Sequence, residues 1–120
     1  MQPQLPYLAN IEDETKNNTD YRRVVFTGYM QLVLMCIKPG QEIGLEVHEG
    51  HDQFFRIEEG QAKAILDGKE SQLQEDDVLI VPSGVEHNII NDGTEDLKLY
   101  TIYAPAEHPA GTVQHEKAAA

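Results

Sequence analysis

The stretch that decides the fold is Gly44-Leu45-Glu46-Val47-His48-Glu49-Gly50-His51-Asp52-Gln53, which runs on to Gly60. A second stretch, Pro82-Ser83-Gly84-Val85-Glu86-His87, leads to Asn91. Each stretch places metal-binding side chains at the edge of an expected strand, beside a turn. No other part of the chain suggests a chemistry. The four candidate metal ligands are Glu46, His48, Gln53 and His87.

The positions of these four residues follow from strand geometry. Glu46 and His48 are two residues apart, so a strand places both on one face. Gln53 alternates with apolar residues and should point inward, where a buried amide needs a polar partner. That partner is a metal ion or the Glu46 carboxylate. His87 begins a strand after a Pro-x-Gly turn that sets its direction.

From residue 21 onward the pattern is that of β-structure. Turn signals separate short apolar or alternating runs, and we expect strands over 24–26, 31–37, 43–48, 53–57, 62–66, 78–81, 88–90 and 97–103. Asp67-Gly68, which precedes a polar strand, is a strong hairpin signal. Short strands without a long helix predict an all-β sandwich or small barrel.

The length of 120 residues suits one domain. We expect a single domain over 1–120, with an N-terminal arm at 1–20, a barrel core at 21–105 and a C-terminal tail at 106–120. The arm should pack on the core, with one helical turn near 11–15. The tail should lack regular secondary structure or pair with a second subunit.

Composition excludes several partners. The net charge of −12 leaves no basic footprint for nucleic acid, and an anionic membrane surface would repel the chain. No apolar run approaches the roughly 20 residues that span a bilayer, and the N-terminus lacks the features of a signal peptide. The single cysteine, Cys36, excludes an internal disulfide and favours a cytoplasmic protein.

The two stretches resemble the two motifs of the cupin superfamily. Aligning Gly60 with the last glycine of the first motif puts Gln53 at the glutamate position, His48 at the second histidine and Glu46 at the first histidine. The second motif is matched at Pro82, Gly84, His87 and Asn91, whereas Asp76 replaces its leading glycine. Over about 21–105 the chain looks like the small bacterial cupins described as mannose-6-phosphate isomerase-like. This resemblance implies a double-stranded β-helix, a jelly-roll barrel.

The resemblance also implies a divalent metal ion. The superfamily set of three histidines and one glutamate carries one carboxylate, and so does the set here, in a different position. Glu46, His48 and His87 form a triad of two histidines and one carboxylate, which suits Fe as well as Zn, Mn, Co or Ni. Gln53 is either a ligand or a group that orients Glu46 or a substrate.

Three functions are compatible with such a site. The first is a metal-dependent enzyme or binder of a small polar molecule, of the sugar-phosphate isomerase type, with the metal as Lewis acid. The second is an Fe(II)-dependent dioxygenase, and the third is a non-catalytic ligand-binding protein. No general base is identified. Because small cupins commonly pair through β-strands, we expect a homodimer.

Other residues receive structural interpretations. His51, His108 and His115 are expected on surface loops or the tail, and Tyr100 and Tyr103 in the core. Arg56 should form a salt bridge on the outer face of its sheet, and Glu86 should face away from His87. The pocket walls should come from the barrel interior, with Phe55, Ile57, Met35 or Leu34, and Ile89 or Ile90.

Overall fold

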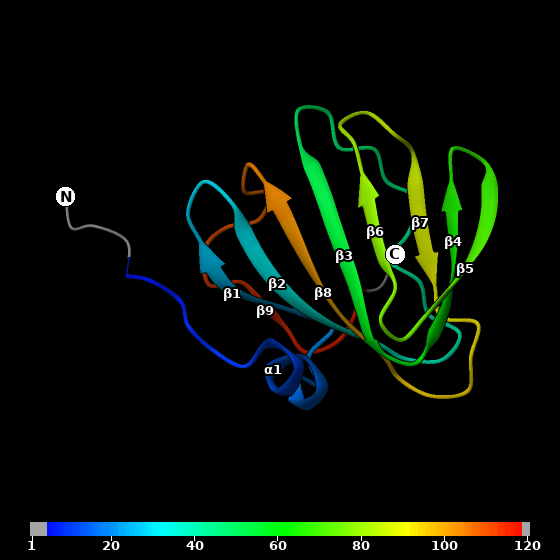
Figure 1. Cartoon of the computed structure of the whole chain (residues 1–120), viewed down its shortest axis with the longest axis horizontal. Helices are drawn as coiled ribbons and strands as arrows, with labels where there is room; N and C mark the ends of the chain where they lie inside the picture. Colours follow the sequence, from blue (N-terminus) through cyan, green and yellow to red (C-terminus); the bar gives the residue numbers. More distant parts are fainter. Residues whose placement is uncertain (1–4, 119–120) are drawn as a thin grey trace.

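The computed structural model describes residues 5–118, which form two antiparallel sheets and one short helix (Figure 1). The elements are α1 (Ile11–Asn17), β1 (Arg22–Thr27), β2 (Gln31–Ile37), β3 (Asp52–Glu59), β4 (Gln61–Leu66), β5 (Lys69–Gln74), β6 (Val78–Val81), β7 (His87–Ile90), β8 (Leu97–Ala104) and β9 (Val113–Gln114). The large sheet has the strand order β6-β3-β8-β2-β1-β9, and the small sheet has the order β5-β4-β7. The all-β prediction is confirmed.

Strand positions follow the apolar patterns closely. The predicted strands 31–37 and 78–81 coincide with β2 and β6, and five others lie within longer observed strands. Asp67 and Gly68 turn the chain between β4 and β5 with φ angles of 49° and 82°. Two successive residues with positive φ define the type I′ turn that matches the twist of a hairpin, so this prediction is also confirmed.

The interior between the sheets is a hydrophobic core. On β3, Phe55 and Ile57 are 1% exposed, and they alternate with outward Phe54 and Arg56. Met35 of β2 and Ile89 of β7 are equally buried. The side chains expected to line a pocket therefore fill the core beneath the candidate site, and only the end of the barrel next to that site is polar.

Helix α1 packs on the outer face of the large sheet, against β2, β3 and β8. Asn10 caps its N-terminus by accepting a hydrogen bond from the backbone N–H of Asp13 at 3.0 Å. Leu34 and Cys36 face outward but are buried, at 1% and 4% exposure. Of the two alternatives expected for the wall, Met35 therefore faces the interior and Leu34 does not. In the described part of the chain, no helix is long and apolar enough to cross a membrane.

The predicted strand over 43–48 is wrong. The segment between β2 and β3 makes only isolated bridges to β7, at Glu42 and Glu46. Gly44, with φ of 108°, interrupts the extended backbone, and its N–H donates to the Asn88 side chain at 2.9 Å instead of joining a ladder. A regular strand cannot continue through a residue in this conformation.

The expectation that the tail lacks regular structure is also wrong, and its pairing with a second subunit stays a prediction. Residues 113–114 form β9, which pairs antiparallel with β1 of the same chain through Arg22 and Arg23. His115 lies 2.6 Å from Asp20, which anchors the segment after β9. The tail thus covers the edge of the large sheet, where unpaired backbone groups would otherwise be exposed. The division of the chain into arm, core and tail stays a prediction.

Candidate metal centre

A polar row crosses the inner face of the large sheet near the end of the barrel. Gln31 of β2 is paired with Tyr103 of β8, and Tyr103 is paired with Gln53 of β3. All three side chains are buried, with exposures of 0%, 2% and 3%. The neighbouring row is apolar apart from Thr101, so the polar atoms gather at one level of the barrel.

Glu46 and His48 meet at this level. The Glu46 backbone exchanges two hydrogen bonds of 2.9 Å with His87, which places Glu46 beside the small sheet. Oε2 of Glu46 lies 2.8 Å from Nε2 of His48, so the expected common face is retained without a regular strand. The two groups are not aligned for a hydrogen bond, however, and the buried Nε2 has no hydrogen-bond partner among residues 5–118.

Gln53 and His87 form a second close pair. Oε1 of Gln53 lies 3.1 Å from Nε2 of His87, and the Gln53 amide donates to Oγ1 of Thr101 at 3.0 Å. Nδ1 of His87 lies 2.9 Å from the carbonyl oxygen of Val85, which can only accept, so Nδ1 carries a proton. A neutral His87 ring then directs its Nε2 lone pair at the Gln53 oxygen, which also only accepts.

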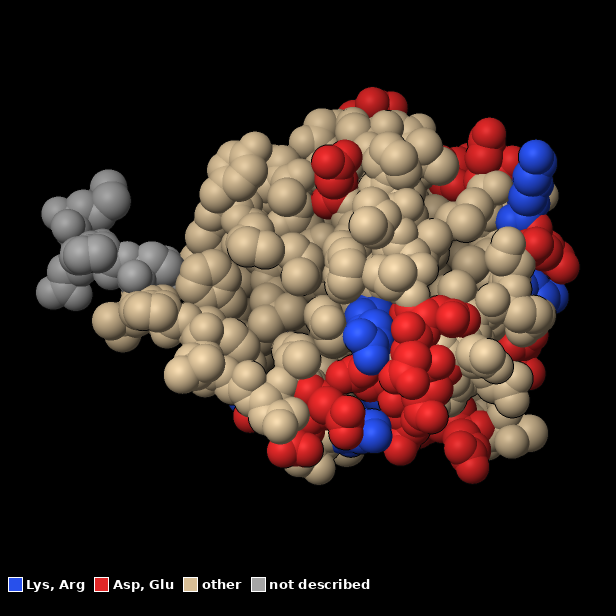
Figure 2. Space-filling model, viewed as in Figure 1, with Lys and Arg blue, Asp and Glu red and all other residues tan. Residues whose placement is uncertain are grey.

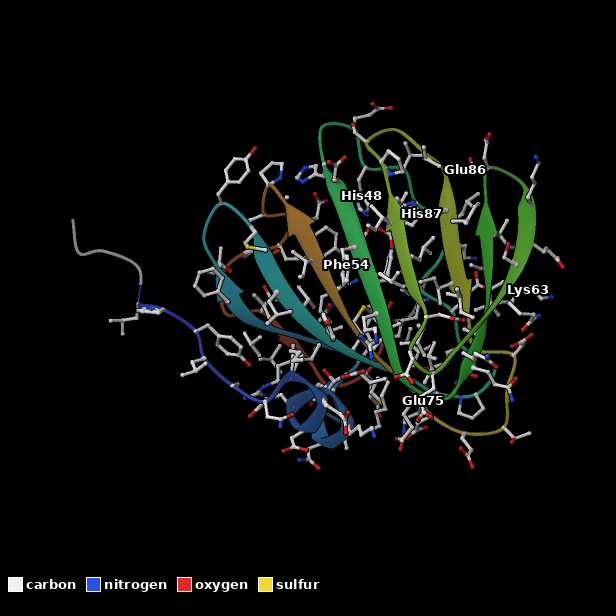
Figure 3. All side chains as sticks on the ribbon, in the orientation of Figure 1. His48, Phe54, Lys63, Glu75, Glu86 and His87 are labelled. Carbon is white, nitrogen blue, oxygen red and sulfur yellow. The ribbon has the colours of Figure 1, made fainter. Side chains whose placement is uncertain are left out.

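The two pairs lie side by side. The rings of His48 and His87 are 5.4 Å apart between centroids, and Figure 3 shows the two side chains next to each other. His87 is 2% exposed, whereas the Glu46 side chain is 28% exposed. The structure therefore brings the four predicted residues together. Gln53 and His87 are buried, and Glu46 is partly exposed to solvent.

The donor set fits a divalent cation. Oε1 of Gln53 and Nε2 of His87 are two acceptor atoms in contact, and a bound cation relieves their repulsion. Metal–ligand bonds of about 2.1 Å at right angles separate neighbouring ligands by about 3.0 Å, close to the two observed distances. Within residues 5–118, no three His, Cys, Asp or Glu side chains gather closely enough to hold a metal ion without rearrangement. An amide, Gln53, contributes the fourth donor and engages His87.

The loop after β8 covers the site, so His51 and His108 are not the surface residues that were expected, whereas His115 is exposed as expected. Oε2 of Glu107 lies 3.1 Å from Nε2 of His51, and Oε1 lies 3.7 Å from Nδ1 of His48. Nδ1 of His51 donates to the carbonyl oxygen of Pro105 at 2.8 Å. His51 thus links the loop to the segment that carries Glu46 and His48.

Gln31 holds this loop in place from below. Its Oε1 accepts from the backbone N–H groups of Glu107 and His108 at 3.1 and 2.9 Å. Its Nε2 donates to the carbonyl oxygen of His108 at 2.8 Å and to Thr27 at 3.0 Å. Because this fully buried amide is fully hydrogen-bonded, it sets the position of the Glu107 carboxylate beside His48.

Tyr103 and His108 form the wall next to Gln31. The Tyr103 ring stands edge-on to His48, with centroids 5.6 Å apart, and its hydroxyl lies 3.4 Å from Nε2 of His108. Burial, followed by the negative charge of Glu46, raises the pKa of Tyr103 far above its ordinary value. Burial, followed by the positive charge of Arg22, lowers the pKa of His108. Tyr103 is therefore a neutral hydrogen-bond donor at the site.

Three contributing residues escaped prediction, and two of them left a signal. Gln31 and Thr101 are polar residues at inward positions of otherwise apolar strands. Each should have indicated a buried polar network, by the same reasoning that identified Gln53. Glu107 left no such signal, because loop 105–109 has no periodicity that fixes the direction of a side chain.

Two interpretations of residues outside the site are confirmed. Arg56 forms a salt bridge with Asp76 at 3.0 Å, and Glu86 is exposed and faces away from buried His87.

Two packed antiparallel sheets with histidines at one end of the barrel define a small β-barrel protein with a candidate metal centre. The family model described as the cupin domain matches residues 33–103, which is more than half of the chain. The chain belongs to the cupin family, and the predicted double-stranded β-helix is confirmed. Membership in the mannose-6-phosphate isomerase-like group is not established by this match.

Two relatives match nearly the whole chain. The uncharacterized protein YrkC of Bacillus subtilis is 42% identical over 94% of this chain and 64% of its own length. The uncharacterized protein L612 of Acanthamoeba polyphaga mimivirus is 46% identical over 89% of this chain and 70% of its own length. The chain thus spans about two thirds of the length of these relatives.

Solved structures agree with this assignment. The crystal structure of BH2720 from Bacillus halodurans is 42% identical, with a TM-score of 0.91, over 92% of this chain and 89% of that chain. A predicted oxalate decarboxylase from Thermotoga maritima is 29% identical, with a TM-score of 0.61, over 63% of this chain and 66% of that chain. Cupin family members commonly bind a divalent metal ion.

Proposed function

We propose that this cupin binds one divalent metal ion through Glu46, His48, Gln53 and His87 and uses it to hold a small polar molecule. The main support is the contact of two acceptors, 3.1 Å between Oε1 of Gln53 and Nε2 of His87, next to the buried Nε2 of His48, which lies 2.8 Å from Glu46 and has no hydrogen-bond partner among residues 5–118. Protein interiors rarely leave two acceptors facing each other, because each loses its hydrogen bond to water without gaining a donor. The bound ion would supply Lewis-acid chemistry.

The residues around the donors suit an anionic ligand. The buried Nε of Arg22 has no hydrogen-bond partner in the described part of the chain, and the positive charge of Arg22 lowers the pKa of His108. A Thermotoga maritima relative named oxalate-binding protein is 32% identical over 57% of this chain and 56% of its own length. A small carboxylate is therefore the first ligand class to test.

The site also admits two catalytic alternatives. A sugar-phosphate isomerase needs a base near the ligand, and Glu107 is the carboxylate next to His48 and His51. An Fe(II)-dependent dioxygenase needs the triad of Glu46, His48 and His87. Turnover of aldose and ketose phosphates would establish the first activity. Oxygen uptake that requires Fe²⁺ and an organic substrate would establish the second. Binding without turnover would leave a ligand-binding protein.

Metal analysis tests the proposal directly. Protein purified without chelators or nickel resin should bind close to one Mn²⁺ or Zn²⁺ ion per chain by calorimetric titration. His87→Ala removes a buried ligand, so we expect its metal affinity to fall at least a hundredfold, and that of Glu46→Gln to fall at least tenfold.

His115→Ala is the matched control, because it removes an exposed histidine outside the site. We expect its affinity to equal that of the unchanged protein. Equal affinities for His87→Ala and His115→Ala would show that the metal binds elsewhere on this acidic surface. Absence of stoichiometric binding by the unchanged protein would reject the proposal.

A further inference from the structure

The three arginines of the chain differ in their partners. Arg23 forms a salt bridge with Asp20 at 3.2 Å, and Arg56 forms one with Asp76 at 3.0 Å. Arg22 forms no salt bridge within residues 5–118, although the chain has 21 Asp and Glu residues. A positive charge without a carboxylate partner is unexpected in such an acidic chain, and it needs an explanation.

Arg22 lies on the inner face of the large sheet. Its neighbour Arg23 is opposite outward Leu34 of β2, so Arg22 points to the other face. Nη1 of Arg22 donates to Oε1 of Gln114 on β9 at 2.5 Å, whereas the buried Nε makes no hydrogen bond within residues 5–118. Nε of Arg56 is also unbonded, but that guanidinium has carboxylate partners. Only Arg22 thus lacks both a counterion and a hydrogen bond at Nε.

Arg22 acts on the same side chains as the candidate ligand Glu46. Burial raises the pKa values of Tyr21 and Tyr103, the negative charge of Glu46 raises both further, and the positive charge of Arg22 opposes both shifts. After burial, the charge of Arg22 is also the main cause that lowers the pKa of His108. Arg22 is therefore within electrostatic reach of the wall of the metal centre that Tyr103 and His108 form.

The distribution of surface charge leaves recognition of an anion to local groups. A net charge of −12 repels small anions at long range. On the face that Figure 2 shows, the Asp and Glu side chains gather mainly at the end near α1. In the same orientation, Figure 3 places His48 and His87 nearer the opposite end. A metal ion and Arg22 would supply two positive charges there, which outweigh the weaker field of distant carboxylates.

The shape of the guanidinium selects the ligand. Its N–H groups form a planar fork, and Nε and Nη2 together match the two oxygens of a carboxylate. Gln114 occupies Nη1, on the other side of the fork. A carboxylate at Arg22 would give the buried Nε its missing acceptor. A planar carboxylate also needs less room beside a buried atom than a tetrahedral phosphate does.

We propose that Arg22 binds one carboxylate of a small dicarboxylate whose other carboxylate binds the metal ion. The metal-binding half of this inference rests on the proposed function. The ligand then meets one positive charge at each end, which distinguishes it from a monocarboxylate. Since Gln114 of β9 holds the guanidinium, the C-terminal segment contributes to the ligand site.

Calorimetric titration of the full chain, loaded with one equivalent of Mn²⁺ or Zn²⁺, tests this site. Oxalate, malonate and succinate are the probes, and we expect at least one of them to bind with one molecule per chain. Acetate and inorganic phosphate should bind about tenfold more weakly. Arg22→Gln should lower the affinity of the best dicarboxylate by about tenfold or more, because it removes the charged fork. The variant should still bind one metal ion, because Arg22 is not a metal donor.

Arg23→Gln is the matched control, because it removes the same charge from the adjacent position on the outer face. It should leave the dicarboxylate affinity unchanged. Arg22→Lys keeps the charge and the aliphatic stem but loses the fork, so we expect about threefold to tenfold weaker binding than in the unchanged protein. This variant decides the outcome if Arg22→Gln disturbs the fold.

Equal dicarboxylate affinities for the Arg22 variants and Arg23→Gln would overturn the proposal. Equal affinities of the unchanged protein for acetate and the dicarboxylates would overturn it as well, and so would absence of dicarboxylate binding. Failure to bind metal would instead reject the proposed function. The Arg22 half is then tested by NMR titration of the metal-free chain with the same probes. Weaker binding that depends on Arg22 and not on Arg23 would support it, and any other result would reject it.

Discussion

At the scale of single residues, the candidate site is organised by polar side chains that satisfy one another. Gln31 is fully buried, yet its amide makes four hydrogen bonds, three of them to loop 105–109. The loop is therefore held by one side chain beneath it, and Glu107 is directed toward His48 and His51. Oε1 of Glu107 lies 3.7 Å from Nδ1 of His48, beyond hydrogen-bond distance, so its negative charge acts on His48 electrostatically.

Glu107→Gln should weaken metal binding without destabilising the fold. We expect about a tenfold lower affinity for Mn²⁺ or Zn²⁺, since the substitution removes a negative charge next to His48 and His51. The free energy of unfolding should change by less than about 1 kcal/mol, because the Glu107 side chain is partly exposed. Calorimetric titration and urea denaturation measure the two quantities.

Glu70→Gln controls for the loss of one negative charge. Glu70 lies on β5 with a 64% exposed side chain and pairs only loosely with Lys63, at 3.8 Å. Its replacement should leave metal affinity unchanged. If both variants lost affinity equally, the effect of Glu107 would be one of overall charge, and a local effect of Glu107 on the metal centre would be rejected.

At the scale of elements, the connections between strands decide where the ligands lie. The segment over 42–50 is held by bridges at Glu42 and Glu46 and by the Gly44–Asn88 hydrogen bond, so it reaches the site without forming a regular strand. The β3–β4 turn is equally constrained. Gly60 has φ of 91°, and a Cβ atom there would lie 2.8 Å from the carbonyl oxygen of Asp96.

Gly60→Ala should therefore destabilise the protein by roughly 2–4 kcal/mol, combining an unfavourable backbone conformation with a backbone clash. Gly40→Ala is the control, because Gly40 has φ of 82° and its Cβ would meet no atom within 4 Å. We expect about 1–2 kcal/mol for that variant. Urea denaturation compares the two, and equal losses would show that the close approach to Asp96 does not matter.

At the scale of the whole molecule, the candidate metal centre joins both sheets. Gln53 belongs to the large sheet, His87 to the small sheet, and Glu46 and His48 to the segment that crosses between them. The unfolded chain cannot hold these residues together. A metal ion that binds only the folded state stabilises it by mass action.

Thermal unfolding should therefore depend on metal concentration. At a free Mn²⁺ or Zn²⁺ concentration one hundred times the dissociation constant, we expect about 2.7 kcal/mol of stabilisation and a rise in Tm of roughly 10 °C. His87→Ala should lose this rise. The same rise in the variant would show that the ion acts on the acidic surface, with no bond between the sheets.

Several features were open to prediction because they depend on residues close together in the chain. Alternation of apolar and polar residues located the strands, and Asp67-Gly68 located a hairpin, because backbone sterics and burial act locally. Spacing placed Glu46 and His48 on one face, and the resemblance to the two cupin motifs added Gln53 and His87 to the candidate ligands. The sequence also argued against a membrane-spanning helix and a disulfide-rich fold, because it has no long apolar run and only one cysteine.

By itself, the sequence determined the all-β fold, the cupin resemblance and the four candidate ligands, because each follows from local periodicity or motif spacing. Only the tertiary structure decided that β9 covers β1 and that Gln31 holds loop 105–109 next to His48 and His51. These features depend on pairing register between distant segments. Such pairing is set by the packing of the whole chain, and no local pattern encodes it.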